Sequence, residues 1–244
     1  MWQYKNIEVN SVYELITSYS KSEFDSPFRS TIPLVMTVQY FPQLFLKLTN
    51  NKELSEYKII FEYETPVQKG KGLPSYSDLM LLNSQESICI EAKRTEPRYE
   101  KVEKWLNGTK NRELVLEGWI ELINKKSINK IEIKDVISFP YQMVHRTASA
   151  CSTSKETTKL VYFGYDLSNE MVDYYCEYLR NIKVLVGSSI EVIIAFFITK
   201  SNSVFSKIEK EWNNGKKQGL SNQIIDIISN SNFMNIELDK INYF

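Results

Sequence analysis

The stretch Tyr76–Lys93, YSDLMLLNSQESICIEAK, consists of two apolar runs separated by a turn at Asn83-Ser84. Short apolar runs on either side of turn residues predict a β-hairpin. In an antiparallel pair joined at this turn, Asp78 in the first strand and Glu91 in the second come roughly opposite each other. The hairpin therefore predicts that two carboxylates lie face to face.

Side chains of a strand alternate between its two faces with a period of two residues. Glu91 and Lys93 therefore share one face of the second strand, and Ile88 and Ile90 share the other. A charged pair at the end of an otherwise apolar strand is costly to bury unless it is paired or used. The pattern predicts a functional site here, although a Glu-x-Lys on a solvated strand edge is the common alternative.

Outward from this hairpin, apolar runs alternate with helical periodicities along the 244-residue chain. We expect strands at about residues 58–64, 76–82, 87–93, 160–165 and 190–198, and helices at about 10–20, 32–48, 138–151, 168–182, 204–213 and 222–229. Ser138 is expected to cap the start of its helix. This alternation predicts an α/β fold with a central mixed β-sheet flanked by helices. We expect a single domain over residues 1–244, with a helical insertion at about 98–135.

The charge balance of the chain limits the classes of function. Thirty Lys and Arg residues balance thirty Asp and Glu residues, so the formal net charge is zero. A strongly basic chain would by itself argue for nucleic-acid binding, and this chain does not. Any affinity for nucleic acid must come from local patches or from bound metal.

The cysteines and the apolar runs indicate the compartment. Cys89, Cys151 and Cys176 are far apart and form no CxxC or CxxH unit, which argues against structural zinc and suits a reducing cytoplasm. The longest apolar run, Val192–Ile198, is far shorter than the ~20 residues that a membrane-spanning helix needs. We therefore expect a soluble, cytoplasmic protein without a membrane partner.

The residue types of the hairpin suit metal-dependent phosphodiester cleavage. Mg²⁺ prefers oxygen ligands and is often held by one or two carboxylates while keeping several waters. The bound metal polarises the phosphoryl oxygen and lowers the pKa of its water. A nearby lysine can position that water and stabilise charge in the transition state.

Asp78 followed by Glu91-Ala92-Lys93 at the end of an apolar strand resembles the PD-(D/E)xK nucleases, the superfamily with the restriction-endonuclease-like fold. The resemblance covers about residues 58–165. It implies that Asp78 and Glu91 ligate Mg²⁺, for which Mn²⁺ substitutes, and that the Ala92 carbonyl adds a ligand. It implies that Lys93 is the catalytic lysine. The proline that precedes the aspartate in the family is replaced by Ser77.

Many members of this superfamily carry a further glutamate upstream. Glu64 and Glu62 are the candidates here, and both lie on the strand expected at 58–64. The helix expected at 32–48 contains no carboxylate, which favours the strand. We expect Glu64 to take this role, with Glu62 almost equally suited. A surface pair without a role is the alternative.

The helix after Pro140 carries a polar stripe of Gln142, His145, Arg146 and Ser149 at helical spacing. Several branches of the superfamily place a glutamine on this helix, and Gln142 is the matching position. A lone histidine on a helix is more often structural than catalytic. Arg146 suits either a phosphate or an ion pair with a neighbouring carboxylate.

Two arginines follow the Glu-x-Lys motif directly. Arg94 and Arg98 are placed either to meet a nucleic-acid backbone or to lie in a solvated loop, and the sequence does not choose between these alternatives.

The resemblance implies a Mg²⁺-dependent endonuclease that hydrolyses phosphodiester bonds in DNA, with RNA as a further possible substrate. A role in restriction or defence is compatible with the class. A homodimer is expected by analogy, because cleavage of a duplex usually needs two active sites. The alternative is a non-catalytic or partner-dependent module of the same fold that binds nucleic acid or protein.

Overall fold

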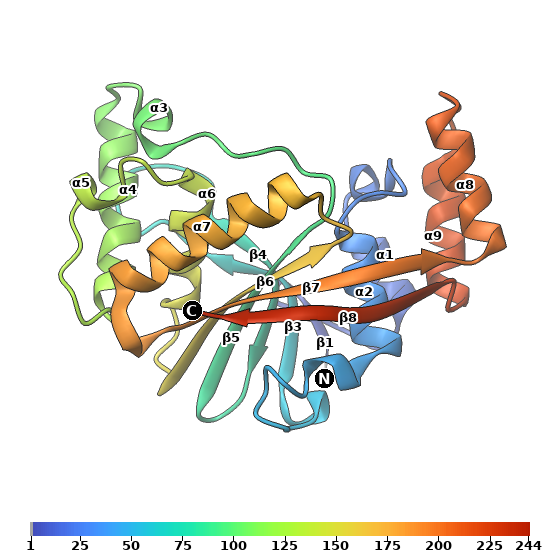
Figure 1. Cartoon of the computed structure of the whole chain (residues 1–244), viewed down its shortest axis with the longest axis horizontal. Helices are drawn as coiled ribbons and strands as arrows, with labels where there is room; N and C mark the ends of the chain where they lie inside the picture. The colour runs from blue at the N-terminus through green and yellow to red at the C-terminus, as the bar shows by residue number, and fades with distance from the viewer. Residues whose placement is uncertain (1) are drawn as a thin grey trace.

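The computed structural model describes residues 2–244. Within these residues the strands form one mixed eight-stranded sheet in the order β2-β1-β3-β4-β5-β6-β7-β8, with helices on both faces (Figure 1). The strands are β1 (Trp2–Tyr4), β2 (Ile7–Val9), β3 (Lys58–Thr65), β4 (Ser75–Leu82), β5 (Glu86–Lys93), β6 (Thr157–Tyr165), β7 (Glu191–Ser201) and β8 (Met234–Tyr243). The expected α/β class with a central mixed sheet is confirmed.

Connection length explains the directions of the central strands β3 to β7. Short loops join β3 to β4 and β4 to β5, and both pairs are antiparallel. Helices lie between β5 and β6 and between β6 and β7, and both of these pairs are parallel. A hairpin turn reverses the chain, whereas a helical crossover returns it to the same end of the sheet. The centre of the sheet therefore changes from antiparallel to parallel at β5.

The helices divide between the two faces of the sheet. They are α1 (Val12–Ser18), α2 (Thr31–Tyr40), α3 (Val102–Leu106), α4 (Lys110–Asn124), α5 (Ile133–Val136), α6 (Tyr141–Ala150), α7 (Asn169–Val186), α8 (Ser203–Asn213) and α9 (Leu220–Asn230). Short 3₁₀ turns cover Lys21–Phe24, Pro42–Phe45, Leu54–Glu56 and Gly187–Ser189.

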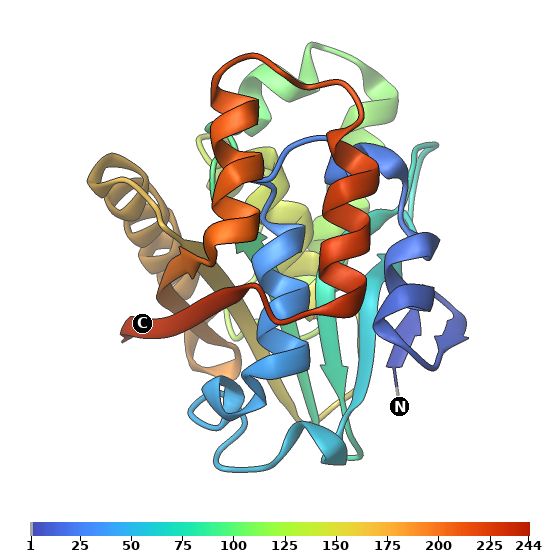
Figure 2. The same cartoon turned by 90° about the vertical axis from the view of Figure 1, so that its right-hand side faces the viewer.

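One apolar core lies between the sheet and α1, α2, α8 and α9, and we call it the first core. Figure 2 shows α2, α8 and α9 on this face. The second core lies between the opposite face and α4, α6 and α7. In α7, Tyr175, Leu179, Ile182 and Val186 are buried at helical spacing, so one stripe of the helix packs on the sheet.

The N-terminal half of the chain contains a helix shorter than predicted. The helix expected at 32–48 is α2, which ends at Tyr40, and a 3₁₀ turn begins at Pro42. Proline has no N–H to donate, and it disfavours helical backbone in the residue before it. Phe41 accordingly leaves the helix with φ −130° and ψ 44°.

The helix that carries the polar stripe begins later than predicted. Pro140, with extended ψ of 125°, precedes the first helical residue, Tyr141. The Pro140 carbonyl accepts the backbone N–H groups of Met143 and Val144. Pro140 therefore occupies the N-cap position that was predicted for Ser138. The stretch at 98–135 holds α3, α4 and most of α5.

Candidate active site

The β4–β5 ladder ends at the pair Leu79–Ile90, one position before Asp78 and Glu91. Continued by one position, this register places Asp78 opposite Glu91, as the hairpin predicts. Beyond the last pair, the Ala92 N–H donates to Oδ2 of Asp78 at 2.7 Å. The side chain of Asp78 thus accepts a backbone donor at the point where the ladder stops.

Glu62 lies opposite Asp78 on the other neighbouring strand, between two ladder pairs of β3 and β4. Its φ of +51° lies in the left-handed region, which is uncommon for residues other than glycine. Phe61 belongs to the first core, while Tyr63 packs against the second. Two residues apart on a regular strand should share a face, so the alternation predicted for this strand breaks at Glu62.

This break separates the two candidates for the upstream carboxylate. Glu64 is exposed and pairs across the ladder with Tyr76. Glu62 is half-buried, and burial together with the Glu91 carboxylate raises its pKa to about 7 against the opposing effect of Arg146. The structure therefore brings Glu62, and not the favoured Glu64, to the charged cluster.

Glu91 is fully buried and is held between two cations. Its Oε1 accepts a hydrogen bond from Nζ of Lys93 at 2.6 Å, and its Oε2 accepts one from Nε of Arg146. Burial raises the pKa of Glu91, but the charges and hydrogen bonds of Arg146 and Lys93 outweigh burial and leave that pKa below its usual value. Glu91 is therefore ionised in the folded protein.

Arg146 comes from α6 and is held from behind by a polar network. Its Nη1 donates to Oγ of Ser75 at 2.6 Å, and the same Oγ lies 2.8 Å from Nδ1 of His145 and 3.1 Å from Oγ of Ser149. Of the two roles considered for Arg146, the ion pair is the one observed. Burial, Arg146 and Lys93 lower the pKa of His145 well below its usual value, so this histidine is neutral.

Burial and the Glu91 carboxylate also shift the pKa values of Asp78 and Lys93. Removal from water and the Glu91 carboxylate raise the pKa of Asp78 well above its usual range, although Lys93 and Arg146 oppose this. Burial lowers the pKa of Lys93, but Glu91 and Asp78 outweigh burial and raise it well above its usual value. The Lys93 ammonium also lies 5.0 Å from the centre of the Tyr99 ring.

Gln142 lies in the first turn of the same helix as Arg146. Its Oε1 is buried and has no hydrogen-bond partner within residues 2–244. In the described part of the chain, no hydrogen bond links Gln142 to Asp78 or Glu91. Its supporting role thus stays a prediction.

The two arginines after the motif differ in their surroundings. Arg94 is buried and donates to the Asp166 carboxylate, the Thr199 hydroxyl and the Pro27 carbonyl. Arg94 therefore anchors the loop after β5 and matches neither alternative drawn from the sequence. Arg98 is exposed and pairs with Glu170 at 2.7 Å.

The cluster of Glu62, Asp78, Glu91, Lys93 and Arg146 combines three acids with two cations. Among residues 2–244, no three His, Cys, Asp or Glu side chains lie close enough together to hold a metal ion. Each oxygen of an ionised carboxylate has two lone pairs, so the Glu91 oxygens can accept a cation's hydrogen bond and still bind a metal. The residues fit Mg²⁺ held by two carboxylates, with main-chain or water oxygens completing its shell.

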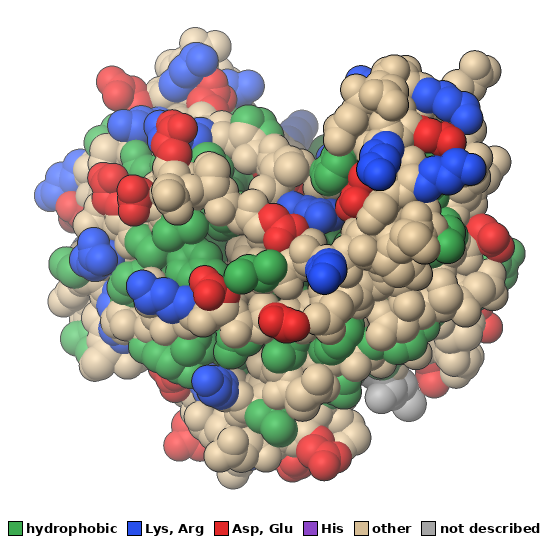
Figure 3. Space-filling view, turned by 45° about the vertical axis from the view of Figure 1, so that its right-hand side comes forward, with side chains coloured by type: hydrophobic (Ala, Val, Ile, Leu, Met, Phe, Trp, Pro, Cys, Tyr) green, Lys and Arg blue, Asp and Glu red, His purple; other side chains and the backbone are tan. Residues whose placement is uncertain are grey.

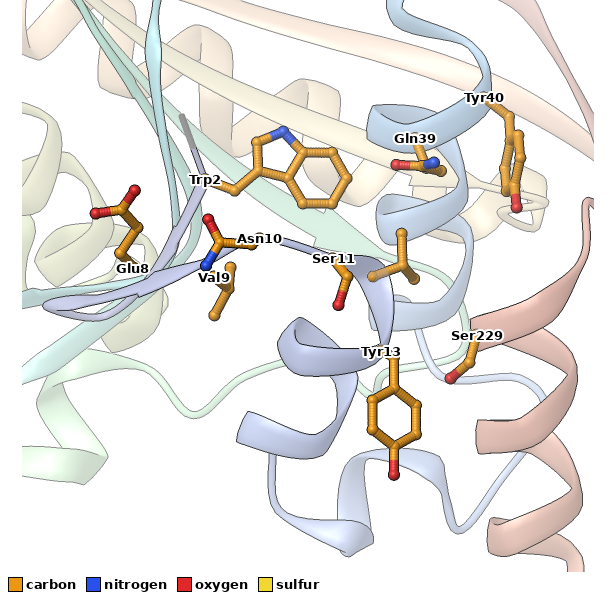
Figure 4. A pocket seen from close by; sticks show the side chains of 10 residues that line it. Trp2, Glu8, Val9, Asn10, Ser11, Tyr13, Gln39, Tyr40 and Ser229 are labelled. Atoms are coloured by element: carbon orange, nitrogen blue, oxygen red, sulfur yellow. The ribbon is translucent and has the colours of Figure 1, made fainter.

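A pocket of about 590 Å³ lies away from this cluster, beside β2, α1 and α2 (Figure 4). Its lining includes the rings of Trp2, Tyr13 and Tyr40, and Glu8 is the one charged side chain among the described lining residues. The pocket does not supply the acid and base groups that the cluster contains.

The visible surface in Figure 3 carries acidic and basic side chains interspersed over the whole face. This distribution agrees with the zero net charge of the chain. Over residues 2–244, none of the helices combines the length and the apolar character needed to cross a bilayer.

The fold and the cluster define an α/β protein with a buried carboxylate–lysine–arginine site at the point where the β4–β5 ladder ends. The family model described as Domain of unknown function (DUF6946) matches residues 8–202, and the chain belongs to this family. The match spans all five residues of the cluster and ends before α8. No curated protein and no solved structure matches the chain.

Proposed function

We propose that the protein is a metal-dependent endonuclease with a restriction-endonuclease-like core that hydrolyses phosphodiester bonds in DNA. The observation that carries this proposal is the position of Asp78 opposite Glu91, with Lys93 bonded to Glu91 at 2.6 Å. The antiparallel strands β3–β5 followed by α6 and the parallel strand β6 support the core. A role in restriction or defence is part of the same proposal.

Asp78 and Glu91 would hold Mg²⁺ or Mn²⁺, with the Ala92 carbonyl as a further ligand. The metal supplies a bound water of lowered pKa and neutralises charge on the phosphate. Burial and the Glu91 carboxylate raise the pKa of Asp78 well above its usual range, which favours the protonated form of this carboxyl group. A divalent cation bound there would favour the ionised form of Asp78, so its binding would release a proton.

Lys93 acts as a charged donor in this scheme. Although burial lowers the pKa of Lys93, the carboxylates of Glu91 and Asp78 raise it well above its usual value. The ammonium therefore stays protonated at neutral pH. It can donate hydrogen bonds to a phosphate oxygen or to the attacking water, and it does not accept a proton.

Glu62 is the group that we assign to proton transfer. Burial and the Glu91 carboxylate raise its pKa to about 7, and a general base works best with a pKa near the working pH. Glu62 thus takes the upstream position for which Glu64 was the first candidate. Gln142 is kept as a supporting residue of the site.

Cleavage of supercoiled plasmid DNA and of RNA, with Mg²⁺ or Mn²⁺, tests the proposal. We expect the wild type to cut DNA and Lys93→Ala to be slower by about 10²-fold or more, the usual loss when one transition-state donor is removed. Lys104→Ala is the matched control, because Lys104 lies on α3 with 82% of its side chain exposed. The proposal fails if neither substrate is cut, or if Lys93→Ala cuts as fast as the wild type.

A non-catalytic or partner-dependent binding module is the second candidate. The burial of Glu91 favours this second candidate, because its side chain is inaccessible to solvent and each of its oxygens already accepts a hydrogen bond from a cation. Such a module would bind DNA without cutting it under any metal. Measuring binding by fluorescence anisotropy beside the cleavage assay separates the two, and sedimentation with and without DNA tests the proposed homodimer.

A further inference from the structure

Arg146 occupies the oxygen of Glu91 that Lys93 leaves open. Its Nε donates to Oε2, while Nζ of Lys93 donates to Oε1 at 2.6 Å. Both cations are nearly buried, with side-chain exposures of 9% for Arg146 and 5% for Lys93. A divalent cation entering the cluster therefore meets two fixed positive charges where water and salt screen them poorly.

The contacts of Arg146 leave one side of the guanidinium available. Its Nη1 is bonded to Ser75, and Ser75 is fixed in turn by His145 and Ser149. Within residues 2–244, the Nη2 group has no hydrogen-bond partner, and it is not sealed from solvent. A guanidinium held on two sides with free donors on the third is prepared for another acceptor.

We infer that Arg146 is a positioning residue that weakens metal binding at Glu91 while it is paired with that carboxylate, and that it transfers its hydrogen bond to a substrate phosphate when one binds. The identity of the substrate rests on the proposed function, while the restraint rests on the contacts above. Guanidinium binds phosphate bidentately, as it does carboxylate. A phosphate that takes the guanidinium frees Oε2 of Glu91, and its negative charge offsets the repulsion between Arg146 and the metal.

Metal and phosphate therefore bind with positive coupling. Coupling between two sites is reciprocal and commonly changes affinity by 5- to 150-fold.

Calorimetric titration of the full chain with Mn²⁺, without DNA, tests the restraint. We expect Arg146→Met to bind Mn²⁺ about tenfold more tightly than the wild type, near the lower end of the usual range for coupled sites. Lys159→Met is the control, because it removes another buried cation, bonded to Glu86 at the opposite end of β5. Its affinity for Mn²⁺ is expected to stay at the wild-type value.

A second variant keeps the test decisive if Arg146→Met does not fold. Ser75→Ala leaves the guanidinium in place but removes its Nη1 partner, so we expect a smaller gain in Mn²⁺ affinity, about threefold. A role in packing alone would leave Mn²⁺ affinity unchanged or lower it. Unchanged or weaker binding in the folded variants, or no Mn²⁺ binding by any protein, overturns the restraint.

The coupling to phosphate is tested with duplex DNA in a Lys93→Ala background, in which cleavage of the DNA is expected to be much slower. We expect DNA to raise Mn²⁺ affinity about tenfold in Lys93→Ala and to leave it unchanged in Lys93→Ala/Arg146→Met. An equal gain in both proteins contradicts the role of Arg146.

If the wild type cuts DNA but Arg146→Met shows no gain in Mn²⁺ affinity, the inference fails and the proposed function stands. If Mn²⁺ affinity rises but nothing is cut, the proposed function fails and the restraint stands.

Discussion

Glu91 stays ionised in the interior because two cations reach it from different parts of the chain. Lys93 is two residues away on the same strand, and Arg146 is 55 residues further along. Removing one partner of a buried ion pair leaves an uncompensated charge and commonly costs about 3–5 kcal/mol. The buried negative charge of Glu91 in the apolar strand β5 is therefore compensated in part by Arg146 of α6.

Glu62 gives the first prediction at the scale of a residue. Burial and Glu91 raise its pKa from 4.5 to about 7, so the folded chain binds more protons than the unfolded chain between these values. The contribution of protonated Glu62 to the free energy of unfolding is therefore fully present below pH 4.5 and is lost as pH rises through 7. We expect Glu62→Gln to be more stable than the wild type above pH 7, by about 1–3 kcal/mol, and to show no such gain near pH 4.5.

Urea unfolding at pH 5 and pH 8, in the presence of EDTA, measures this difference. Glu64→Gln is the control, because Glu64 is exposed on the same strand. A Glu62→Gln variant whose stability changes with pH as the wild type does would show that Glu62 is not the titrating carboxylate.

The sequence predicted the pairing of the hairpin residues but not the remaining contacts of the site. Asp78 and Glu91 face each other because strand register follows from the turn, which is a local property. The choice of Glu62 over Glu64 depends on a positive φ, and local sequence does not disclose such a backbone conformation. The partner of Arg146 depends on how α6 docks on the sheet, which is set by long-range packing.

At the scale of elements, α4 supports the helix that carries Arg146. The two helices pack against each other in the second core, and Trp119 of α4 donates through Nε1 to the Tyr141 hydroxyl of α6 at 3.0 Å. At Gly118, α4 meets the β3–β4 loop. A Cβ atom at Gly118 would lie 2.9 Å from the backbone nitrogen of Lys69.

This close approach gives a prediction for Gly118→Ala. Alanine favours a helix over glycine by about 1 kcal/mol, so helix propensity alone predicts a more stable protein. The clash is with backbone, which cannot turn away as a side chain can, and overpacking of this kind costs about 1–3 kcal/mol. We expect a net loss of stability in urea unfolding. Glu113→Ala, an exposed change in the same helix, should change stability little. If Gly118→Ala is instead more stable than the wild type, the β3–β4 loop moves away from the new methyl group and the predicted clash does not occur.

The element boundaries that sequence reasoning missed have physical causes. The second helix stops where Phe41 precedes Pro42, although the apolar pattern continues to Leu48. Strand β8 pairs with β7 at the edge of the sheet and carries exposed charged residues, so it lacks the apolar run that predicts a buried strand. The buried strands β5, β6 and β7 were predictable because both of their faces are apolar.

At the scale of the whole molecule, the two cores meet at the strands that supply the site. Leu79 and Ile90 belong to the first core, Met80 and Cys89 to the second, and Glu91 follows directly in β5. The cluster is thus connected to both layers, so a ligand that binds it should stabilise global folding.

Thermal unfolding with and without Mn²⁺ tests this link between the cluster and the whole fold. A ligand present at 100 times its Kd adds about 2.7 kcal/mol of stability, and 1 kcal/mol shifts the Tm of a chain of this size by about 2–4 °C. We therefore expect saturating Mn²⁺ to raise the Tm by about 5–10 °C and EDTA to reverse the shift. Asp78→Asn should abolish the shift because it removes a charged ligand, whereas Asp226→Asn, an exposed change on α9, should keep it. A Tm that does not respond to Mn²⁺, or an equal rise in Asp78→Asn, would mean that the cluster does not hold the metal.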